Sequence, residues 1–294
     1  MVRYSAKFVK SVFKVIQMKQ LVGRTMVTPP KRRHLTAKQL QQTTIPQKTE
    51  WIGGQELVTL FPKMTGNRHI FYLHGGGYAL EASPFHAQIQ RYFVETYQLK
   101  VSYFNYPLAP EHTAKETLAL TKEAFQRLAY LYPDDQFTFF GDSAGGGLAM
   151  SLAQQARNEG WSKRPKKMTL ISPWLDMTLS DPRSQALAVK DVLLAGDLLK
   201  QAGKAYAGDW ALDDPRVSPL YGGFDELGQL LVISGTDDIL YPDVLRLQQS
   251  IKHSKGTTLD LVVVPEMMHD FVVYPLKESL QYLDQIGHFI VADT

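Results

Sequence analysis

The chain has 294 residues, a formal net charge of +3 and no cysteine. This length is enough for one large hydrophobic core. The absence of cysteine excludes a disulfide framework and a cysteine-ligated metal site, as expected of a cytoplasmic protein. No apolar run approaches the roughly 20 residues that cross a bilayer. The N-terminal segment also lacks the apolar core of a signal peptide, because it is interrupted by Lys7, Lys10, Lys14 and Lys19.

The charge is unevenly distributed along the chain. Residues 1–49 contain eleven Lys and Arg and no acidic residue, and the remainder carries 21 basic and 29 acidic side chains. Within residues 3–20, apolar side chains recur at helical spacing beside lysines, which predicts a basic amphipathic helix. Such a helix could bind an anionic membrane or an acidic substrate, or cover the body of the protein with its lysines facing water or pairing with acids. No aromatic–basic interleaving accompanies the charge, so nucleic-acid binding is not expected.

Beyond residue 50, strand-like and helix-like stretches alternate, as in a doubly wound α/β sheet. The expected strands are 55–61, 69–73, 101–106, 137–141, 168–172, 229–234 and 259–264, and the expected helices are 84–97, 113–130, a segment ending at 157, 191–207 and 276–291. The helix over 191–207 is not followed by a strand until residue 229, which places it in a cap rather than on the sheet.

The first candidate functional motif is the triplet Gly75-Gly76-Gly77, which follows the strand 69–73 and His74. Three successive glycines let backbone N–H groups converge on one point, as in an oxyanion hole. A glycine triplet alone would more often be a flexible loop. The strand and the histidine before it, together with the serine motif further along the chain, favour the oxyanion hole.

The second motif is Gly141-Asp142-Ser143-Ala144-Gly145, which lies between the strand 137–141 and a helix-compatible segment. A serine at a sharp strand-to-helix turn has a strained backbone and an exposed hydroxyl, and glycines flank it because strand and helix pass too closely for a Cβ. The N-terminus of the following helix favours negative charge at the serine. The motif therefore predicts Ser143 as a nucleophile, whereas the five-residue pattern alone would also fit an ordinary turn.

From roughly residue 50 to its end, the chain resembles the hormone-sensitive-lipase-like α/β-hydrolases, which are bacterial carboxylesterases with a small helical cap. Besides the two motifs, segments 106–112, 172–176 and 217–220 match that family, while Pro107 and Gly147 replace its usual arginine and asparagine. The resemblance implies an α/β-hydrolase fold with a mostly parallel sheet flanked by helices. It also implies N-terminal cap helices in residues 1–50, a catalytic domain over 51–294 and a cap insertion at about 180–215.

In this fold the catalytic residues follow the chain order serine, acid, histidine, which leaves His253, His269 and His288 as candidate bases. His253 lies in a polar stretch typical of a helix C-terminus, where a cation complements the helix dipole. His288 lies in an amphipathic helix and is expected to pack or face solvent. His269 follows the strand 259–264 and a short loop, from which it can reach a serine at the same sheet edge, so it is the predicted base.

The acid is expected after the strand 229–234, where Gly235 is followed by two aspartates, Asp237 and Asp238. The spacing of the family favours Asp238, and Asp237 remains the alternative. Asp243 is instead expected to cap a helix that starts near Val244. The acid would hold His269 in the tautomer that accepts the serine proton.

The residues and the resemblance together predict a serine carboxylesterase that hydrolyses small, short-acyl esters through an acyl-enzyme. The predicted site consists of Ser143, Asp238 and His269, with the N–H groups of Gly76, Gly77 and Ala144 as oxyanion donors. An amidase or another acyl-transfer hydrolase, and a non-catalytic protein that binds a small ligand, are the alternatives. No metal or cofactor is expected. The resemblance assigns the N-terminal helices to the cap, so membrane contact is not expected, and a homodimer is left open.

Overall fold

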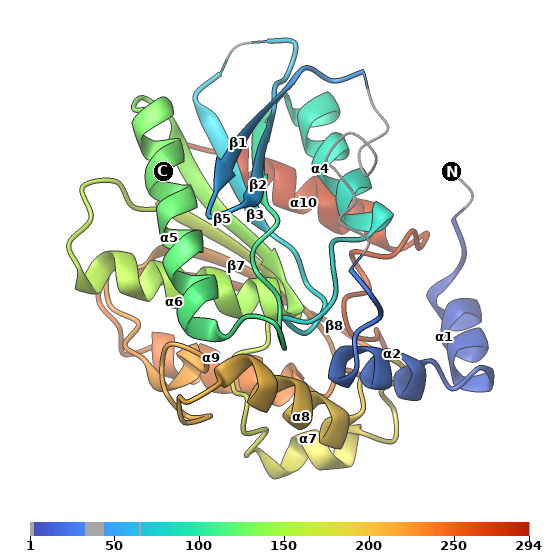
Figure 1. Ribbon diagram of the computed structural model, residues 1–294. Coiled ribbons are helices and arrows are strands. Elements are labelled where there is room, and N and C mark those ends of the chain that lie inside the picture. Colours follow the sequence, from blue (N-terminus) through green and yellow to red (C-terminus); the bar gives the residue numbers. More distant parts are fainter. Residues whose placement is uncertain (1–2, 33–43, 65, 294) are drawn as a thin grey trace.

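The computed structural model describes residues 3–32, 44–64 and 66–293. Within these ranges, eight strands form one sheet in the order β1-β2-β4-β3-β5-β6-β7-β8, with β1 and β2 antiparallel to their neighbours and the other pairs parallel (Figure 1). The strands are β1 (Gln47–Ile52), β2 (Gln55–Leu60), β3 (Arg68–Leu73), β4 (Lys100–Phe104), β5 (Gln136–Asp142), β6 (Lys167–Ile171), β7 (Gly228–Gly235) and β8 (Thr257–Val264). The mostly parallel sheet expected from the sequence is therefore confirmed.

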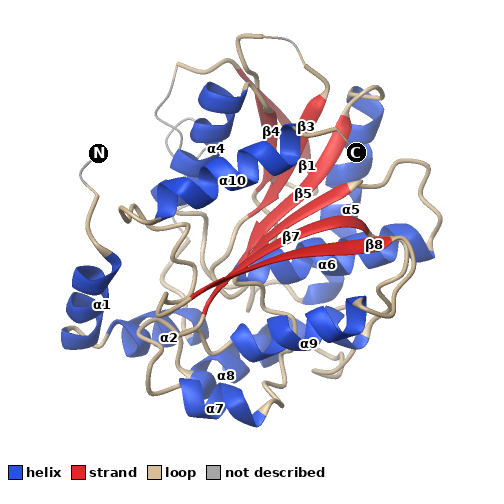
Figure 2. Ribbon diagram, turned by 180° about the vertical axis from the view of Figure 1, so that it is seen from behind, coloured by secondary structure: helices blue, strands red, loops and turns tan. Residues whose placement is uncertain are grey.

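Helices cover both faces of the sheet. One face carries α4 and α10, and the other carries α5, α6 and α9 (Figure 2). The helices and the single-turn helix η1 are α1 (Ala6–Val15), α2 (Met18–Val27), α4 (Pro84–Tyr97), α5 (Ala114–Leu131), α6 (Ser143–Asn158), α7 (Pro182–Leu187), α8 (Gly196–Ala207), η1 (Pro219–Tyr221), α9 (Tyr241–Ile251) and α10 (Ser279–Val291). None of these described helices is long and apolar enough to cross a membrane.

Apolar strands make the sheet the centre of the core. Residues 137–142 of β5 are all buried, because this strand has neighbours on both sides and helices on both faces. On one face, the Phe125 ring of α5 packs edge-on against Phe137 and Phe139, with ring centroids 5.1 and 4.8 Å away. These ring contacts attach α5 to the central strand β5.

The strand order reverses next to β3, because β4 pairs with one side of β3 and β5 with the other. At such a reversal the connections leave in opposite directions, and a crevice opens at the carboxyl ends of the strands. The loops after β3, β5, β7 and β8 therefore meet at one edge of the sheet. Helices α1, α2, α7 and α8 also lie at this edge (Figure 1).

The basic amphipathic helix predicted within residues 3–20 is present as α1. Helix α1 ends at Val15, and Gln17 has a left-handed backbone with φ 51°, after which α2 begins at Met18. The break turns α2 away from α1, and α2 packs closely on α8, since a Cβ on Gly23 would lie 2.5 Å from Leu198 Cδ1. Because glutamine carries no turn signal, the spacing of the apolar residues did not mark this break.

The helix expected over 191–207 begins later, at Gly196. Asp191 delays its start, because Asp191 Oδ1 accepts the backbone N–H groups of Leu193 and Leu194, each at 2.8 Å, and holds this segment in a turn.

The expectation that Asp243 caps α9 is also wrong. Asp243 lies inside the first turn of α9, which begins at Tyr241.

Two elements were not expected from the sequence. Strand β1 is an edge strand whose residues 47–51 are largely exposed, so it lacks the apolar run that marks a central strand. Helix α7 is only six residues long, and its start is fixed by Asp181, whose side chain accepts the N–H of Arg183, and by Pro182 in the first turn.

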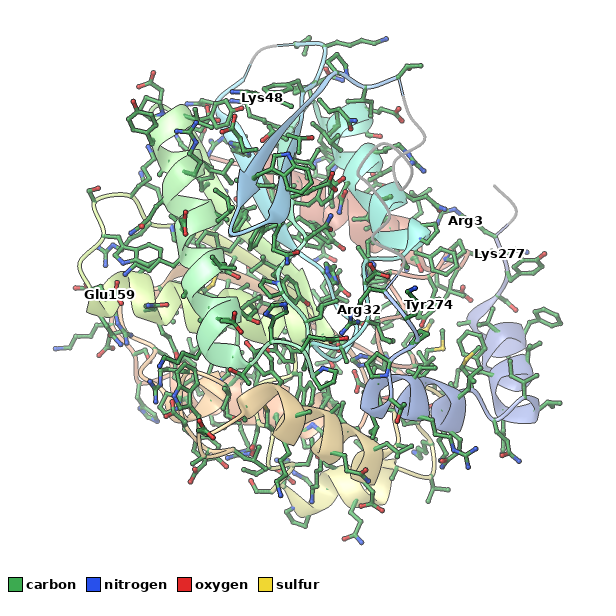
Figure 3. The ribbon with its side chains drawn as sticks, viewed as in Figure 1. Arg3, Arg32, Lys48, Glu159, Tyr274 and Lys277 are labelled. Atoms are coloured by element: carbon green, nitrogen blue, oxygen red, sulfur yellow. The ribbon has the colours of Figure 1, made fainter. Side chains whose placement is uncertain are left out.

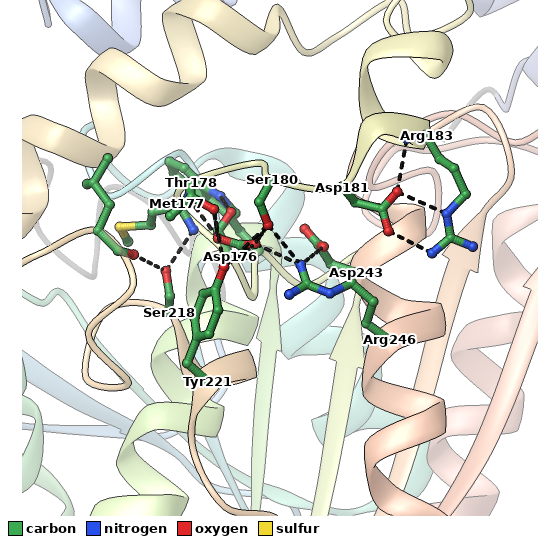
Figure 4. Close-up of polar contacts among 12 residues, drawn as sticks. Asp176, Met177, Thr178, Ser180, Asp181, Arg183, Ser218, Tyr221, Asp243 and Arg246 are labelled. Atoms are coloured by element: carbon green, nitrogen blue, oxygen red, sulfur yellow. Dashed lines mark hydrogen bonds and ion pairs between the residues drawn. The ribbon is translucent and has the colours of Figure 1, made fainter.

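A cluster of polar side chains around two buried aspartates, Asp176 and Asp243, joins the loop after β6 to α9 (Figure 4). Asp176 Oδ2 accepts hydrogen bonds from Ser180 at 2.8 Å, Tyr221 at 3.0 Å and Arg246 at 2.8 Å. Arg246 also donates to Asp243 Oδ1 at 2.9 Å, while the buried Asp243 Oδ2 has no hydrogen-bond partner among the described residues. One guanidinium thus serves two buried carboxylates, which leaves the second incompletely compensated.

This cluster makes the stability of the fold depend on pH. Burial and the neighbouring Asp176 carboxylate raise the pKa of Asp243 to about 7. An aspartate in an unfolded chain has a pKa of about 4. Between these two values the folded protein holds a proton that the unfolded chain has released. The free energy of unfolding therefore falls as pH rises through this window.

We expect Asp243→Asn to remove this dependence. The difference in free energy of unfolding between the variant and the wild type should grow in favour of the variant by roughly 2–4 kcal/mol from about pH 4 to pH 8. Urea unfolding at several pH values measures the difference. Asp260→Asn, at an exposed position of β8, is the control and should show a difference that does not change with pH. A gain that is equally large at pH 4 would contradict the assignment.

Candidate active site

Ser143 lies at the turn between β5 and α6 with a φ of 50°, in the left-handed region that is strained for a serine. The flanking glycines allow this turn. A Cβ on Gly141 would lie 2.3 Å from the Gly145 carbonyl oxygen, and one on Gly145 would lie 2.0 Å from the Leu73 carbonyl oxygen. The strand-to-helix turn predicted from the sequence therefore has the predicted steric cause.

His269 lies in the loop after β8, and its Nε2 is 2.9 Å from Ser143 Oγ. Its other ring nitrogen, Nδ1, is 2.8 Å from Asp238 Oδ2. All three side chains are buried, Ser143 at 3%, His269 at 4% and Asp238 at 0% exposure. The structure thus brings together the serine, histidine and favoured aspartate of the sequence prediction in one hydrogen-bonded chain. Because Asp238 faces Nδ1, it favours the tautomer that leaves Nε2 free to accept a proton from the serine.

Asp238 is held by the backbone around it. Its second oxygen, Oδ1, accepts the N–H of Leu240 at 2.9 Å. Buried Asp191 braces the same loop from the chain between β6 and β7, since Asp191 Oδ2 accepts the N–H of Ile239 at 3.0 Å. Burial and the nearby Asp238 raise the pKa of Asp191 to about 6. Asp191 was not identified from the sequence, because its role depends on a contact with a loop almost 50 residues away along the chain.

The other candidates lie elsewhere. Asp237 points away from His269 and forms an ion pair with Lys10 of α1, which also donates to the Glu266 carbonyl oxygen at 2.7 Å. His253 follows the end of α9, as expected. His288 lies on α10, where its ring packs edge-on against Tyr97 at 5.5 Å, which is the packing role expected for it.

The glycine loop begins directly beside the serine turn. Gly76 and Gly77 have φ values of 116° and 62°, conformations that side-chain-bearing residues rarely adopt. Ala144 lies in the first turn of α6, where backbone N–H groups have no partner within the helix. Met26 of α2 covers the loop, since a Cβ on Gly77 would lie 2.7 Å from its sulfur. The three predicted donors are thus placed at the loop and the helix end that flank Ser143.

A buried network behind the glycine loop was not identified from the sequence. Asp142, the residue before Ser143, accepts hydrogen bonds from the Gly75 N–H at 2.9 Å and from Tyr72 Oη at 3.0 Å, and its Oδ2 lies 3.1 Å from His86 Nε2. Burial alone would raise the pKa of Asp142, but His86 outweighs burial and lowers it. Asp142 therefore remains a carboxylate and ties the glycine loop to the serine turn. Its place inside the serine motif was the available sequence signal.

His74, which precedes the glycines, has a structural role. Its ring stacks on Tyr106 with centroids 4.5 Å apart, and its carbonyl oxygen accepts the Tyr106 hydroxyl at 2.6 Å. Burial lowers the pKa of His74 to about 4, so this imidazole is neutral at pH 7.

Gly147, one of the two departures from the family pattern, is required here, because a Cβ would lie 2.2 Å from the Trp174 carbonyl oxygen.

Asp270 adds a second carboxylate beside His269. Its Oδ2 is 3.1 Å from His269 Nε2, the nitrogen that also faces Ser143, and its buried Oδ1 has no hydrogen-bond partner among the described residues. Burial alone would lower the pKa of His269, but Asp238 and Asp270 outweigh burial and hold it well above its usual range. The two carboxylates therefore favour the imidazolium form that appears when His269 takes up a proton.

The sheet order, the serine turn and the adjacent glycine loop define the α/β-hydrolase class of enzymes. A family model described as alpha/beta hydrolase fold matches residues 70–273. The chain belongs to this family. It is 29% identical to an esterase of Acinetobacter venetianus over 225 residues, which cover 75% of this chain and 73% of the esterase. It is also 29% identical to an acetyl-hydrolase of Streptomyces hygroscopicus over 236 residues, which cover 78% and 77% of the two chains.

Solved structures agree with this assignment. The fold matches the crystal structure of a putative esterase from Staphylococcus aureus with a TM-score of 0.81 and 25% identity, covering 94% of this chain and 90% of that one. It also matches a hormone-sensitive lipase from a metagenome library with a TM-score of 0.82 and 23% identity, covering 98% and 99% of the chains. The α/β-hydrolase fold that the resemblance implied is thereby confirmed.

Removing the Asp270 charge should lower the pKa of His269. A carboxylate in contact with a histidine stabilises the charged ring, so we expect Asp270→Asn to shift the pKa of His269 downward. Nuclear magnetic resonance titration of the imidazole measures this shift. The control is Asp243→Asn, which removes a carboxylate that does not contact the ring. An unchanged pKa of His269 in Asp270→Asn would show that Asp270 is not charged beside the ring.

Proposed function

We propose that the protein is a serine carboxylesterase that hydrolyses small esters. The observation that carries this proposal is the hydrogen-bonded chain from Ser143 through His269 to Asp238. The relatives, which are named as esterases and an acetyl-hydrolase, support the same reaction class. A protein that only binds a ligand would not need these three buried side chains to be connected by hydrogen bonds, so we favour the enzyme.

The proposed reaction starts from the neutral form of His269, because an imidazolium cannot accept a proton. In its first half, Ser143 Oγ attacks the ester carbonyl carbon and His269 Nε2 takes the serine proton. The carbonyl oxygen becomes an oxyanion that accepts N–H bonds from Gly76, Gly77 and Ala144. One such donor typically contributes roughly 3 kcal/mol to transition-state stabilisation. Asp238 stabilises the imidazolium without taking its proton. When the tetrahedral intermediate collapses, His269 passes the proton to the leaving alcohol.

In the second half, water replaces the alcohol. His269 Nε2 removes a proton from water, the hydroxide attacks the acyl carbon, and the acid leaves as Ser143 regains its proton. Asp270 faces the same nitrogen at 3.1 Å. We infer that Asp270 stabilises the imidazolium in both halves, because it adds a second negative charge to that of Asp238.

We further propose that two segments, residues 1–50 and about 180–215, form a cap over the site. Residues 1–2 and 33–43 of the first segment lie outside the described part of the chain. Of the rest, α2 packs on α8, and Met26 lies against Gly77. We propose that a cap in this position limits the acyl site and favours short acyl chains. Hydrolysis of p-nitrophenyl esters of increasing chain length measures this preference.

The remaining expectations from the sequence stay predictions. A small ester is the proposed substrate, and the mechanism needs neither metal nor cofactor. A cytoplasmic location rests on the lack of cysteine. Whether the protein forms a homodimer is measured by light scattering.

Ser143→Ala should abolish ester hydrolysis without unfolding the protein. Loss of the nucleophile of a triad costs at least about 10⁴-fold in kcat, while one hydroxyl removed from a turn hardly changes packing. The measurement is p-nitrophenyl acetate turnover together with the thermal midpoint. Ser162→Ala, at an exposed position, is the control and should retain full activity. If Ser143→Ala kept more than about one hundredth of the turnover, the serine mechanism would be wrong.

The two neighbouring aspartates should differ sharply. Asp238→Asn should lower kcat on the order of 10⁴-fold, because asparagine favours the wrong tautomer of His269. Asp237→Asn removes only the charge that pairs with Lys10, so we expect at least about one tenth of the activity to remain. Steady-state kinetics of both variants provide the comparison, and equal losses would reassign the acid.

A further inference from the structure

Helix α1 and its flanks carry an unusual concentration of exposed apolar side chains. Of the 14 large hydrophobic side chains that are exposed in the described residues, six belong to the first 21 residues. Leu21 lies on α2, and we call the other five, which share one face of α1 or adjoin its ends, the outer face: Tyr4, Phe8, Val12, Val15 and Ile16. Phe8 is 55% exposed and Val15 82%. Single exposed hydrophobic residues are ordinary on a protein surface, but a contiguous set marks an interaction site.

The outer face is not needed to hold α1 on the protein, because the opposite face already does so. Ala6 is buried, Val9 and Phe13 pack against the core, and the Phe13 ring meets Tyr274 edge-on at 5.8 Å. The buried face matches the cap interpretation of the sequence. The outer face is left over, and that interpretation does not account for it.

Polar contacts fix the orientation of α1. The Ala6 N–H lies 3.2 Å from each carboxylate oxygen of Glu278, which is a favourable charge at a helix N-terminus. Arg3 donates to the Leu276 carbonyl oxygen at 3.0 Å, and Arg3 and Lys277 lie together beside the start of the helix (Figure 3). Lys10 pairs with Asp237 on the buried side. The outer face is therefore presented to solvent by a helix that is anchored at several points.

The charge around the outer face is positive. Residues 1–49 contain no acidic residue. Lys7 and Lys14 are exposed and have no ion-pair partner among the described residues, and Arg24 of α2 is exposed as well. An apolar stripe bordered by cations is the pattern of a helix that lies in the interface of an anionic membrane, where the lysines bind phosphate groups and the apolar side chains enter the acyl boundary.

A cavity lies between this helix and the loops that neighbour the candidate active site. It has a volume of about 1010 Å³ and is lined on one side by Lys10 and Lys14 of α1 and on the other by Asp191, Asp237 and Met267. Asp237 belongs to the loop of Asp238, and Asp191 accepts a hydrogen bond from that loop. Met267 precedes His269 by two positions. The cavity therefore lies on the side of α1 that faces the protein, opposite the outer face.

We propose that α1 docks this protein on an anionic lipid surface through its outer face. A second copy of the chain is the other candidate occupant, but a two-fold contact between outer faces would bring the lysines of both copies together. An anionic surface neutralises them instead, which is why we favour lipid. The proposal goes beyond the proposed ester hydrolysis, because docking requires neither Ser143 nor turnover.

The test uses full-length Ser143→Ala protein, so that binding is measured without hydrolysis. Sedimentation with phosphatidylcholine vesicles, with and without about one third phosphatidylglycerol, is compared at about 0.1 M and about 1 M salt. We expect binding only to the anionic vesicles, with a large loss at high salt, because the Debye length falls from ~10 Å to ~3 Å. Ester hydrolysis by the wild type is measured separately, so failure of one proposal leaves the other standing.

Matched variants locate the contact. Phe8→Ser with Val15→Ser should weaken vesicle binding at least about tenfold, because two apolar side chains no longer enter the interface. Tyr130→Ser with Val291→Ser removes exposed apolar side chains far along the chain and should leave binding unchanged. Lys7→Gln with Lys14→Gln should remove most of the salt dependence, whereas Lys63→Gln with Lys115→Gln, also exposed, should not.

Unchanged thermal midpoints establish that each variant is folded. Weak binding that is insensitive to salt, or equal losses in the outer-face and control variants, would overturn the proposal. It would also be overturned if light scattering showed a dimer that Phe8→Ser with Val15→Ser dissociates while vesicle binding is absent, since the outer face would then join two copies of this chain.

Discussion

The close approach of strand β5 to helix α6 is the constraint on which the site depends. The chain reverses so sharply at Ser143 that Gly141 and Gly145 leave no space for a Cβ, and Ser143 itself takes a φ of 50°. Such strain persists only where the surroundings enforce it. Here the enforcing element is a buried parallel strand with hydrogen-bonded neighbours on both sides. The central sheet thus supplies the rigidity that holds a strained nucleophile in place.

The same turn also organises the glycine loop. Asp142 precedes Ser143 in the chain, and its carboxylate accepts the Gly75 N–H at the start of that loop. His86 of α4 keeps Asp142 ionised and thereby strengthens this hydrogen bond. Nucleophile and proposed oxyanion donors are therefore positioned by one buried carboxylate, although they belong to loops some 70 residues apart. Preorganisation of this kind lets a site stabilise charge without moving at the moment of reaction.

A feature could be predicted from the sequence when the residues that cause it lie close together in the chain. The serine turn and the glycine loop depend on local sterics, so residue types alone indicated them, and alternation of strands and helices indicated the sheet. Contacts between distant segments left no such pattern. Asp191 braces the Asp238 loop, and Lys10 selects Asp237 as its partner, only because the fold brings these segments together. The left-handed Gln17 that divides α1 from α2 also carried no local signal.

The ion pair of Lys10 gives the N-terminal helix a direct link to the catalytic loops. Lys10 contacts Asp237, which adjoins Asp238, and the Glu266 carbonyl oxygen, which lies three positions before His269. A single ammonium group therefore fastens the two loops to each other and to α1. Since the pair is only partly buried, it contributes little to overall stability. Its consequence is geometric, because it ties the position of α1 to both of the loops that carry Asp238 and His269.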